Sequence, residues 1–176
     1  ALGIALRALT TVYLGSNTLR VSFMLVPVAF AGMLFGVPWA AAVGALIDLA
    51  GFFVFPSGGA YFPGFTISGA LEGVVCGLLF YKKPASVWRT AVCVLVLALP
   101  LHVFLTNLWL DMAASLANGN YFRFWADNSY LFWPAIPVRL VKETILMPFY
   151  AVIFYLLARF VLPPVRKIFD AGAGNR

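Results

Sequence analysis

The chain has 176 residues, of which 63% are hydrophobic and only 10% are charged. Soluble domains carry about 25% charged residues, so the composition excludes an ordinary water-soluble domain. The formal charge of +6 does not indicate nucleic-acid binding, because the lysines and arginines flank long apolar segments, as the positive-inside rule describes for cytoplasmic loops.

Breaks at glycine and proline divide the sequence into apolar segments long enough to cross a membrane. We expect helices over residues 1–15, 24–36, 38–55, 63–82, 88–112 and 134–163. Residues 1–176 are therefore predicted to form a single integral membrane domain, an all-α bundle of six transmembrane helices. Cys76 and Cys93 fall inside these segments, where burial explains them without a disulfide or a metal site.

Basic residues at two places set the predicted orientation of the bundle. Lys82, Lys83 and Arg89 flank the loop between the fourth and fifth helices, and Arg166 and Lys167 follow the sixth. Positive charge marks cytoplasmic loops, so both regions and both termini are expected on the cytoplasmic side. The extracellular face then carries three outer loops, at residues 16–23, 56–62 and 113–133.

Each outer loop has features that suit a ligand site on the extracellular side, beneath the loops. Residues 16–23 alternate polar and apolar types, which predicts a short extended cap. Residues 55–66 combine glycines, prolines and four aromatic rings, and irregular backbone near a membrane survives where protein covers it or where it lines a wet cavity. Residues 113–133 are rich in aromatics and amides, which indicates either an interfacial aromatic belt or a lid over a ligand.

Four ionisable residues fall within the predicted helices. Arg7, Asp48 and Glu72 would each cost about 2.5–3.5 kcal/mol to insert alone, so pairing inside the bundle is expected. We predict a structural ion pair of Arg7 with Asp48 or Glu72, with direct ligand contact as the alternative. His102, beside Pro100, is expected to be a satisfied interior histidine and is left out of the site.

The outer half of the bundle collects the predicted ligand-binding residues. Arg139, Lys142 and Glu143 lie at i, i+3 and i+4, where an Arg139–Glu143 ion pair would leave Lys142 to meet an anion. Asn107 can read donor and acceptor edges, and Trp109 can stack on a ring or anchor the helix at the interface. The full set suits a flat, heteroaromatic, anionic molecule and comprises Arg20, Phe55, Tyr61, Phe65, Thr66, Ser68, Asn107, Trp109, Arg139 and Lys142.

Motifs for catalysis are missing from the sequence. It has no G-x-x-x-x-G-K-[ST] phosphate loop and no H-E-x-x-H, and a single histidine cannot build a multi-histidine metal site. We therefore expect no enzyme activity, no catalytic residue, no metal and no cofactor. Ala1, Ala5 and Ala8 give the first helix a small-residue face that another helix could approach closely.

Seven stretches of sequence, taken in order, carry a family resemblance: residues 4–9, 19–23, 31–36, 44–49, 55–58, 62–66 and 139–143. They resemble the substrate-binding S components of energy-coupling factor (ECF) vitamin transporters, and within them the folate branch, over nearly the whole chain. The outer loop at 113–133 is longer than this branch leads us to expect.

The resemblance implies a substrate and partners. It implies a six-helix bundle in a prokaryotic cell membrane that captures folate, or a related planar anionic vitamin, outside the cell. It also implies docking on a transmembrane scaffold subunit that carries two ATPase subunits. In this family alanines on the first helix contact the scaffold, and Ala1 and Ala5 occupy the matching positions.

Other functions stay open at the level of sequence. The chain could be an S component for a different vitamin or a deazapurine. It could be a stand-alone secondary transporter or channel in which Arg7, Asp48, Glu72 and His102 form a proton path, although no inverted repeat is visible. It could also be a membrane enzyme acting on a lipid with Asp48 and Glu72 as acid or base, although neither lies in a recognisable motif.

Overall fold

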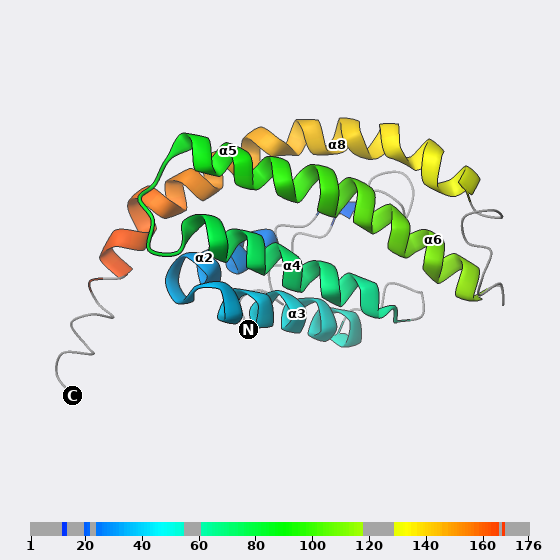
Figure 1. Cartoon of the computed structure of the whole chain (residues 1–176), viewed down its shortest axis with the longest axis horizontal. Coiled ribbons are helices and arrows are strands. Elements are labelled where there is room, and N and C mark those ends of the chain that lie inside the picture. Colours follow the sequence, from blue (N-terminus) through cyan, green and yellow to red (C-terminus); the bar gives the residue numbers. More distant parts are fainter. Residues whose placement is uncertain are drawn as a thin grey trace.

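The structure, a computed structural model, describes residues 12–13, 20–21, 24–54, 61–117, 129–165 and 167, and helices account for most of them (Figure 1). The helices are α2 (Leu25–Phe35), α3 (Val37–Val54), α4 (Pro63–Phe80), α5 (Val87–Val96), η1 (Leu97–Leu105), α6 (Thr106–Ala117), α8 (Ser129–Leu156) and η2 (Leu157–Val161). The segments η1 and η2 are π-helical continuations of their neighbours.

Four helical stretches in the described part of the chain are long and apolar enough to cross a membrane: Val37–Val54, Pro63–Phe80, Val87–Leu116 and Ile136–Val165. The shorter apolar helix α2 is a fifth hydrophobic element. The predicted sixth segment, residues 1–15, lies mostly outside the described residues. A helical membrane bundle is thus seen at the level of these five elements.

The first predicted helix is wrong at its end. Val12–Tyr13 forms strand β1, which pairs antiparallel with strand β2 at Arg20–Val21. Val12 lies opposite Val21, and Tyr13 lies opposite Arg20. β-Branched and aromatic residues favour strands, a preference that the apolar count of this segment hid. The extended cap predicted over residues 16–23 contains β2.

The third outer loop is also shorter than predicted. α6 continues to Ala117, beyond the expected end at residue 112, because the added residues are mostly good helix formers. α8 begins already at Ser129, whereas the prediction placed its start at Pro134 because proline favours a first helical turn. The expected loop at 113–133 is thus helical at both ends.

Small residues let α2, α3 and α4 lie close together. Gly36 alone separates α2 from α3, and its φ of +86° is a backbone conformation that glycine adopts without a Cβ penalty. A Cβ on Gly44 would collide with the carbonyl of Gly69, and a Cβ on Gly73 would collide with the carbonyl of Ala40. Glycine is therefore required for the close contact between α3 and α4.

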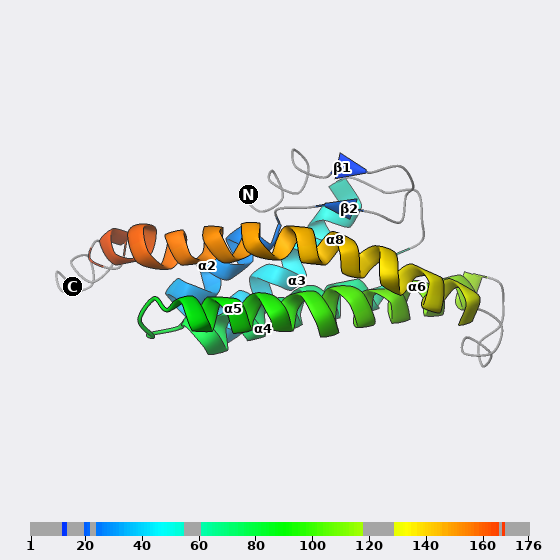
Figure 2. The same ribbon diagram turned by 90° about the horizontal axis from the view of Figure 1, so that it is seen from above.

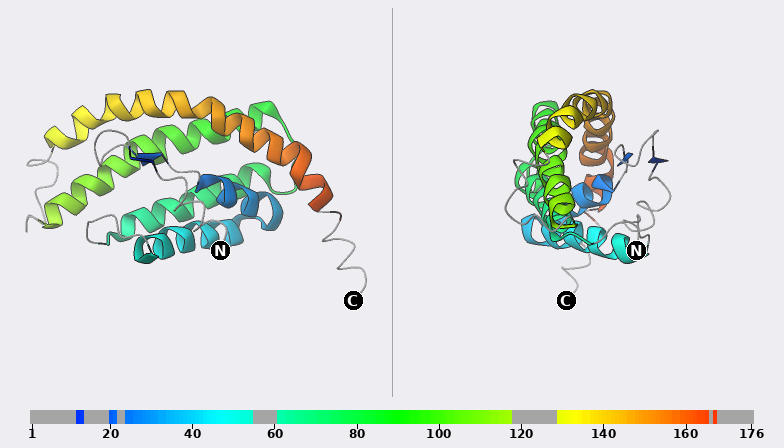
Figure 3. Two further views of the ribbon diagram at one scale, coloured as in Figure 1. Left: turned by 180° about the vertical axis from the view of Figure 1, so that it is seen from behind. Right: turned by 90° about the vertical axis from the view of Figure 1, so that its right-hand side faces the viewer.

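The remaining helices form a long antiparallel pair. The continuous stretch α5–η1–α6 runs beside α8, with α4 on its other side (Figures 1 and 2). Seen end-on, α8 and α3 lie at the two ends of an arc, with α4 and the α5–η1–α6 stretch between them (Figure 3). β1 and β2 lie on the open side of this arc.

Buried residues divide the bundle into two halves. The apolar half lies toward the α4–α5 connection, and its core is formed by Leu25, Ala29, Met33, Cys76, Phe80, Cys93, Val94, Leu97, Leu101, Tyr150, Phe154, Ala158 and Leu162. The polar half lies toward the start of α4, the end of α6 and the start of α8, and it buries Ser68, Glu72, Asn107, Asp111, Ser115, Arg139 and Glu143. Buried polar groups are costly unless partnered, so their concentration in one half indicates a site.

Candidate functional site

His102 joins three helices at the base of the polar half. Its Nε2 lies 3.2 Å from Glu72 Oε1 on α4, and its Nδ1 lies 3.4 Å from Glu143 Oε2 on α8. Lys142 Nζ lies 2.8 Å from Glu143 Oε1. We call these four residues the charged cluster. The analysis of the sequence left His102 out of the site, whereas the structure places it at the floor of the predicted one.

A π-helical segment presents His102 to its partners. Pro100 lies inside η1 and has no backbone N–H to donate, so the regular helical ladder is interrupted there. The backbone N–H of Thr106 then donates to the carbonyl of Leu101, the wide step of a π-helix. Such bulges are frequent at functional sites, and Pro100 was the signal in the sequence that could have drawn attention to His102.

Glu72 and Arg139 have other partners than those predicted. Glu72 contacts His102, and Arg7 lies outside the described residues, so the expected Arg7–Glu72 pair is not part of the described structure. The predicted Arg139–Glu143 pair is wrong, because Glu143 contacts Lys142 and His102 instead. Lys142 is therefore not the free cation of this helix face.

Arg139 is the cation that the structure leaves without a partner. The residue is only 7% exposed, and within the described ranges it makes no hydrogen bond or ion pair. Burying an unpaired charge costs several kcal/mol, by order of magnitude, so a buried guanidinium of this kind calls for an anion or an acceptor. This position is one of the predicted ligand-binding residues.

Two buried polar atoms on α6 are also unpartnered within the described part of the chain. Asn107 is 3% exposed and Asp111 is 4% exposed, and Asn107 Nδ2 and Asp111 Oδ1 lack a hydrogen-bond partner there. The residues are four apart, so they lie on one face of the helix. Native proteins leave few buried polar atoms unsatisfied, and such atoms mark places where a ligand or water completes the bonding.

Trp109 is held against α4. Its Nε1 donates a 2.8 Å hydrogen bond to Ser68 Oγ, and its ring centroid lies 5.9 Å from that of Phe62. A Cβ on Gly64 would collide with the Trp109 ring, so glycine makes room for it. The alternative prediction, that Trp109 anchors the helix at the membrane interface, is not supported by this inward bond. Phe65 packs edge-on against Phe62, with ring centroids 6.0 Å apart.

Tyr61 and Thr66, two other predicted ligand residues, belong to a hydrogen-bond chain. Tyr61 OH lies 2.7 Å from Thr66 Oγ1, which donates a 3.0 Å bond to Asp48 Oδ2. Asp48 therefore links α3 to α4 in the described structure. The remaining predicted groups lie outside the described residues: Ala1, Ala5, Arg7, Ala8, Phe55 and the side chain of Arg20.

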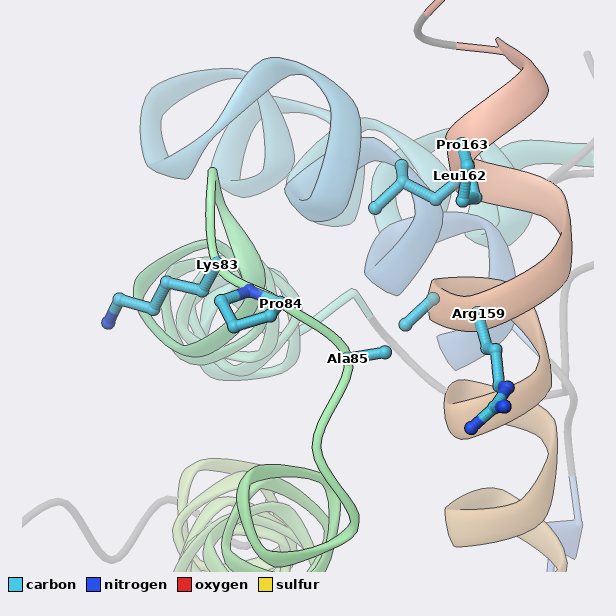
Figure 4. Close-up of a pocket in the computed structure, with 7 residues that line it drawn as sticks. Lys83, Pro84, Ala85, Arg159, Leu162 and Pro163 are labelled. Carbon is cyan, nitrogen blue, oxygen red and sulfur yellow. The ribbon is translucent and has the colours of Figure 1, made fainter.

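A surface hollow of about 350 Å³ lies at the other end of the bundle, where α8 and η2 meet the α4–α5 connection (Figure 4). It is lined by Lys83, Pro84, Ala85, Ala158, Arg159, Leu162 and Pro163. The Lys83 side chain points away from it, and its Nζ donates to the carbonyl of Leu78 at 2.6 Å (Figure 4). This hollow is remote from every described residue of the predicted ligand set.

Comparisons with known proteins agree with this arrangement. The family model described as ECF transporter, substrate-specific component, matches residues 1–158. The folate transporter FolT of Clostridium novyi (strain NT) is 34% identical over 154 residues, 86% of this chain and 81% of that protein. The folate transporter FolT of Leuconostoc mesenteroides subsp. mesenteroides is 28% identical over 169 residues, 92% of this chain and 84% of that protein.

A solved structure is similar as well. The crystal structure of FolT bound with folic acid superposes with a TM-score of 0.69 at 30% identity, and the match covers 89% of this chain and 88% of that one. The family match covers well over half of the chain, and its sequence and fold evidence agree. The chain therefore belongs to the substrate-specific components of ECF transporters, membrane proteins that bind a transport substrate and are not enzymes.

Proposed function

We propose that the chain captures folate outside the cell and delivers it inward as the substrate-binding subunit of an ECF importer. The observation that carries the proposal is the set of buried, unpartnered polar groups in the polar half: Arg139, Asn107 Nδ2 and Asp111 Oδ1. Folate combines a flat pterin ring, which has hydrogen-bond donors and acceptors, with a benzoyl ring and an anionic glutamate tail. Cations, polar groups and the nearby ring of Trp109 suit these three parts.

The predicted topology completes this proposal. Six transmembrane helices with both termini in the cytoplasm would place the polar half toward the outside and the basic α4–α5 connection inside. A ligand would then enter beneath the outer loops and rest above the charged cluster. Arg20, Phe55 and Lys142 are proposed to complete the ligand contacts, together with Tyr61, Phe65, Thr66, Ser68 and Trp109.

The proposed partners follow from family membership. A transmembrane scaffold subunit with two ATPase subunits would supply the energy, since this chain has no phosphate loop of its own. Ala1, Ala5 and Ala8 are proposed to form the helix face that docks on the scaffold. The bundle would sit in a prokaryotic plasma membrane as a single domain.

Ligand titration tests the proposal directly. The purified chain in detergent is titrated with folic acid, and quenching of its tryptophans is followed, with thiamine, riboflavin, biotin and pantothenate as comparison ligands. Binding of folic acid that weakens at least about tenfold, a loss of 1.4 kcal/mol, in Arg139→Ala is the expected result. Lys82→Ala, a cation at the far end, should bind as the wild type does. Tight binding of another vitamin instead of folic acid would contradict the proposed ligand.

The charged cluster favours one competing function, a secondary transporter that moves protons through buried ionisable groups. Uptake into proteoliposomes separates the two. An ECF subunit takes up radiolabelled folate only when scaffold and ATPases are reconstituted with it and ATP is supplied. Uptake by the chain alone, driven by a pH gradient, would contradict the proposal.

A further inference from the structure

The strongest unused feature of the polar half is a pair of buried opposite charges that do not meet. Asp111 lies on α6 and Arg139 lies on α8, both are at least nine-tenths buried, and no ion pair within 4.0 Å joins them. Neither side chain has another ion-pair partner in the described part of the chain. Two such charges in one buried region are stabilised by a molecule that offers donors to the acid and acceptors to the base.

The register of the helices places these groups at neighbouring levels. The α5–η1–α6 stretch is antiparallel to α8, and the His102–Glu143 contact fixes which residues lie opposite (Figure 1). Moving about one turn from His102 toward the end of α6 reaches Asn107, and moving one turn from Glu143 toward the start of α8 reaches Arg139. Asn107 and Arg139 are thus at about the same height, and Asp111 lies one turn farther from the cluster.

The two orphaned atoms on α6 have opposite hydrogen-bonding character. Asp111 Oδ1 is an acceptor, and Asn107 Nδ2 is a donor. A partner that satisfies both must present N–H donors to Asp111 and a carbonyl or ring acceptor to Asn107, separated by about one helical turn or less. An anionic group cannot take the place beside Asp111, because two buried like charges repel.

We propose that Asp111 and Asn107 determine specificity by reading the 2-amino-4-oxo edge of a pyrimidine ring fused within the ligand. This inference rests on the proposed folate function and names the part of the ligand that the α6 face recognises. The 2-amino group and N3–H donate to the Asp111 carboxylate, and the 4-oxo group accepts from Asn107 Nδ2. Arg139 faces the remaining acceptors of the ring, and the anionic tail points away from Asp111 toward the outer end.

This arrangement predicts which heterocycles are accepted. Pterins and deazapurines with a 2-amino-4-oxo edge satisfy both side chains. The 2,4-diamino analogue of folic acid has a second amino group where Asn107 requires an acceptor, and its N3 carries no proton for Asp111. A site built around specific hydrogen bonds rejects an analogue that leaves its buried groups unpaired, by up to about 10⁴-fold.

The experiment measures dissociation constants of folic acid and its 2,4-diamino analogue for the purified full chain. The wild type is expected to prefer folic acid. Asp111→Asn should weaken folic acid at least about tenfold, which is the loss of one charge-assisted bond. Asn107→Asp, which turns the donor into an acceptor, should shift the preference toward the diamino analogue. Asp48→Asn makes the same chemical change at an acid bonded to Thr66 and should leave the preference unchanged.

Each outcome is decisive, provided that circular dichroism shows the variants folded. If the wild type binds folic acid and neither α6 variant alters the ratio of the two constants, the inference is overturned while the proposed function stands. If the wild type binds no pterin at all, the proposed function fails instead. An altered ratio in Asp48→Asn equal to that in Asp111→Asn would also overturn it, because the effect would then not belong to α6.

Discussion

Trp109 Nε1 donates a 2.8 Å hydrogen bond to Ser68 Oγ, and this bond ties α6 to α4 beside the proposed ligand site. Ser68 is buried, so its loss would leave an indole N–H without an acceptor. Because both residues also lie among the proposed ligand contacts, the bond connects the stability of the bundle with the shape of its site.

Removal of this hydrogen bond should destabilise the bundle. Ser68→Ala is expected to lower the free energy of unfolding by about 1–3 kcal/mol, the cost of an unsatisfied buried donor. Trp109→Phe removes the N–H together with part of the ring. Thermal unfolding in detergent of both single variants and the double variant gives their coupling, which should be about 1 kcal/mol. Strictly additive losses would show that the bond contributes nothing to stability.

His102 should be more important for stability than either of its carboxylate partners. His102→Leu leaves Glu72 and Glu143 facing each other without the imidazole between them, which should cost about 3 kcal/mol or more. Combining His102→Leu with Glu72→Gln removes one of the two carboxylate charges and should restore part of the loss. Chemical denaturation compares the variants, and an equal loss in the single and combined variants would contradict this account.

The glycine contact between α3 and α4 should tolerate no side chain. Gly73→Ala places a methyl group against the carbonyl of Ala40 and is expected to cost about 1–3 kcal/mol through overpacking. Ala42→Leu, on the exposed face of α3, is the matched control and should change stability little. Melting temperatures in detergent measure both variants. A neutral Gly73→Ala would mean that the helices separate readily.

Accessibility from the two sides of the membrane tests the proposed orientation. The native Cys76 and Cys93 are buried, so they should react slowly with a maleimide that cannot cross the membrane. Tyr61→Cys should be labelled on intact cells, whereas Ala85→Cys in the exposed α4–α5 connection should be labelled only after permeabilisation. Labelling of Ala85→Cys from outside would invert the topology and place the polar half toward the cytoplasm.

Hydropathy predicted the spanning helices because a bilayer requires long apolar segments with internally satisfied backbones. It could not place the start of α8 or the end of α6, since interfacial residues suit both helix and loop. It also missed β1, where pairing with β2 decides the conformation of Val12–Tyr13. Helix ends and strands near the interface depend on contacts with distant segments, which periodicity does not contain.

The composition of the site was predicted better than its pairings. Arg139 and Glu143 have the spacing of an ion pair, yet His102 from η1 reaches Glu143 and the neighbouring Lys142 takes its other oxygen. Helical spacing reports only contacts within one helix, and this carboxylate is oriented by another. The same limit explains Asp111: nothing in the sequence shows that its partner is missing until the neighbouring helices are in place.

The apolar half has a bioenergetic consequence. Its core of aliphatic and aromatic side chains lies between the polar half and the basic end of the bundle. Moving an ion or a proton through such a layer is costly, because no polar group there can replace the lost hydration. Many copies of this chain could therefore wait in a membrane for their vitamin without short-circuiting the electrochemical gradient on which the cell lives.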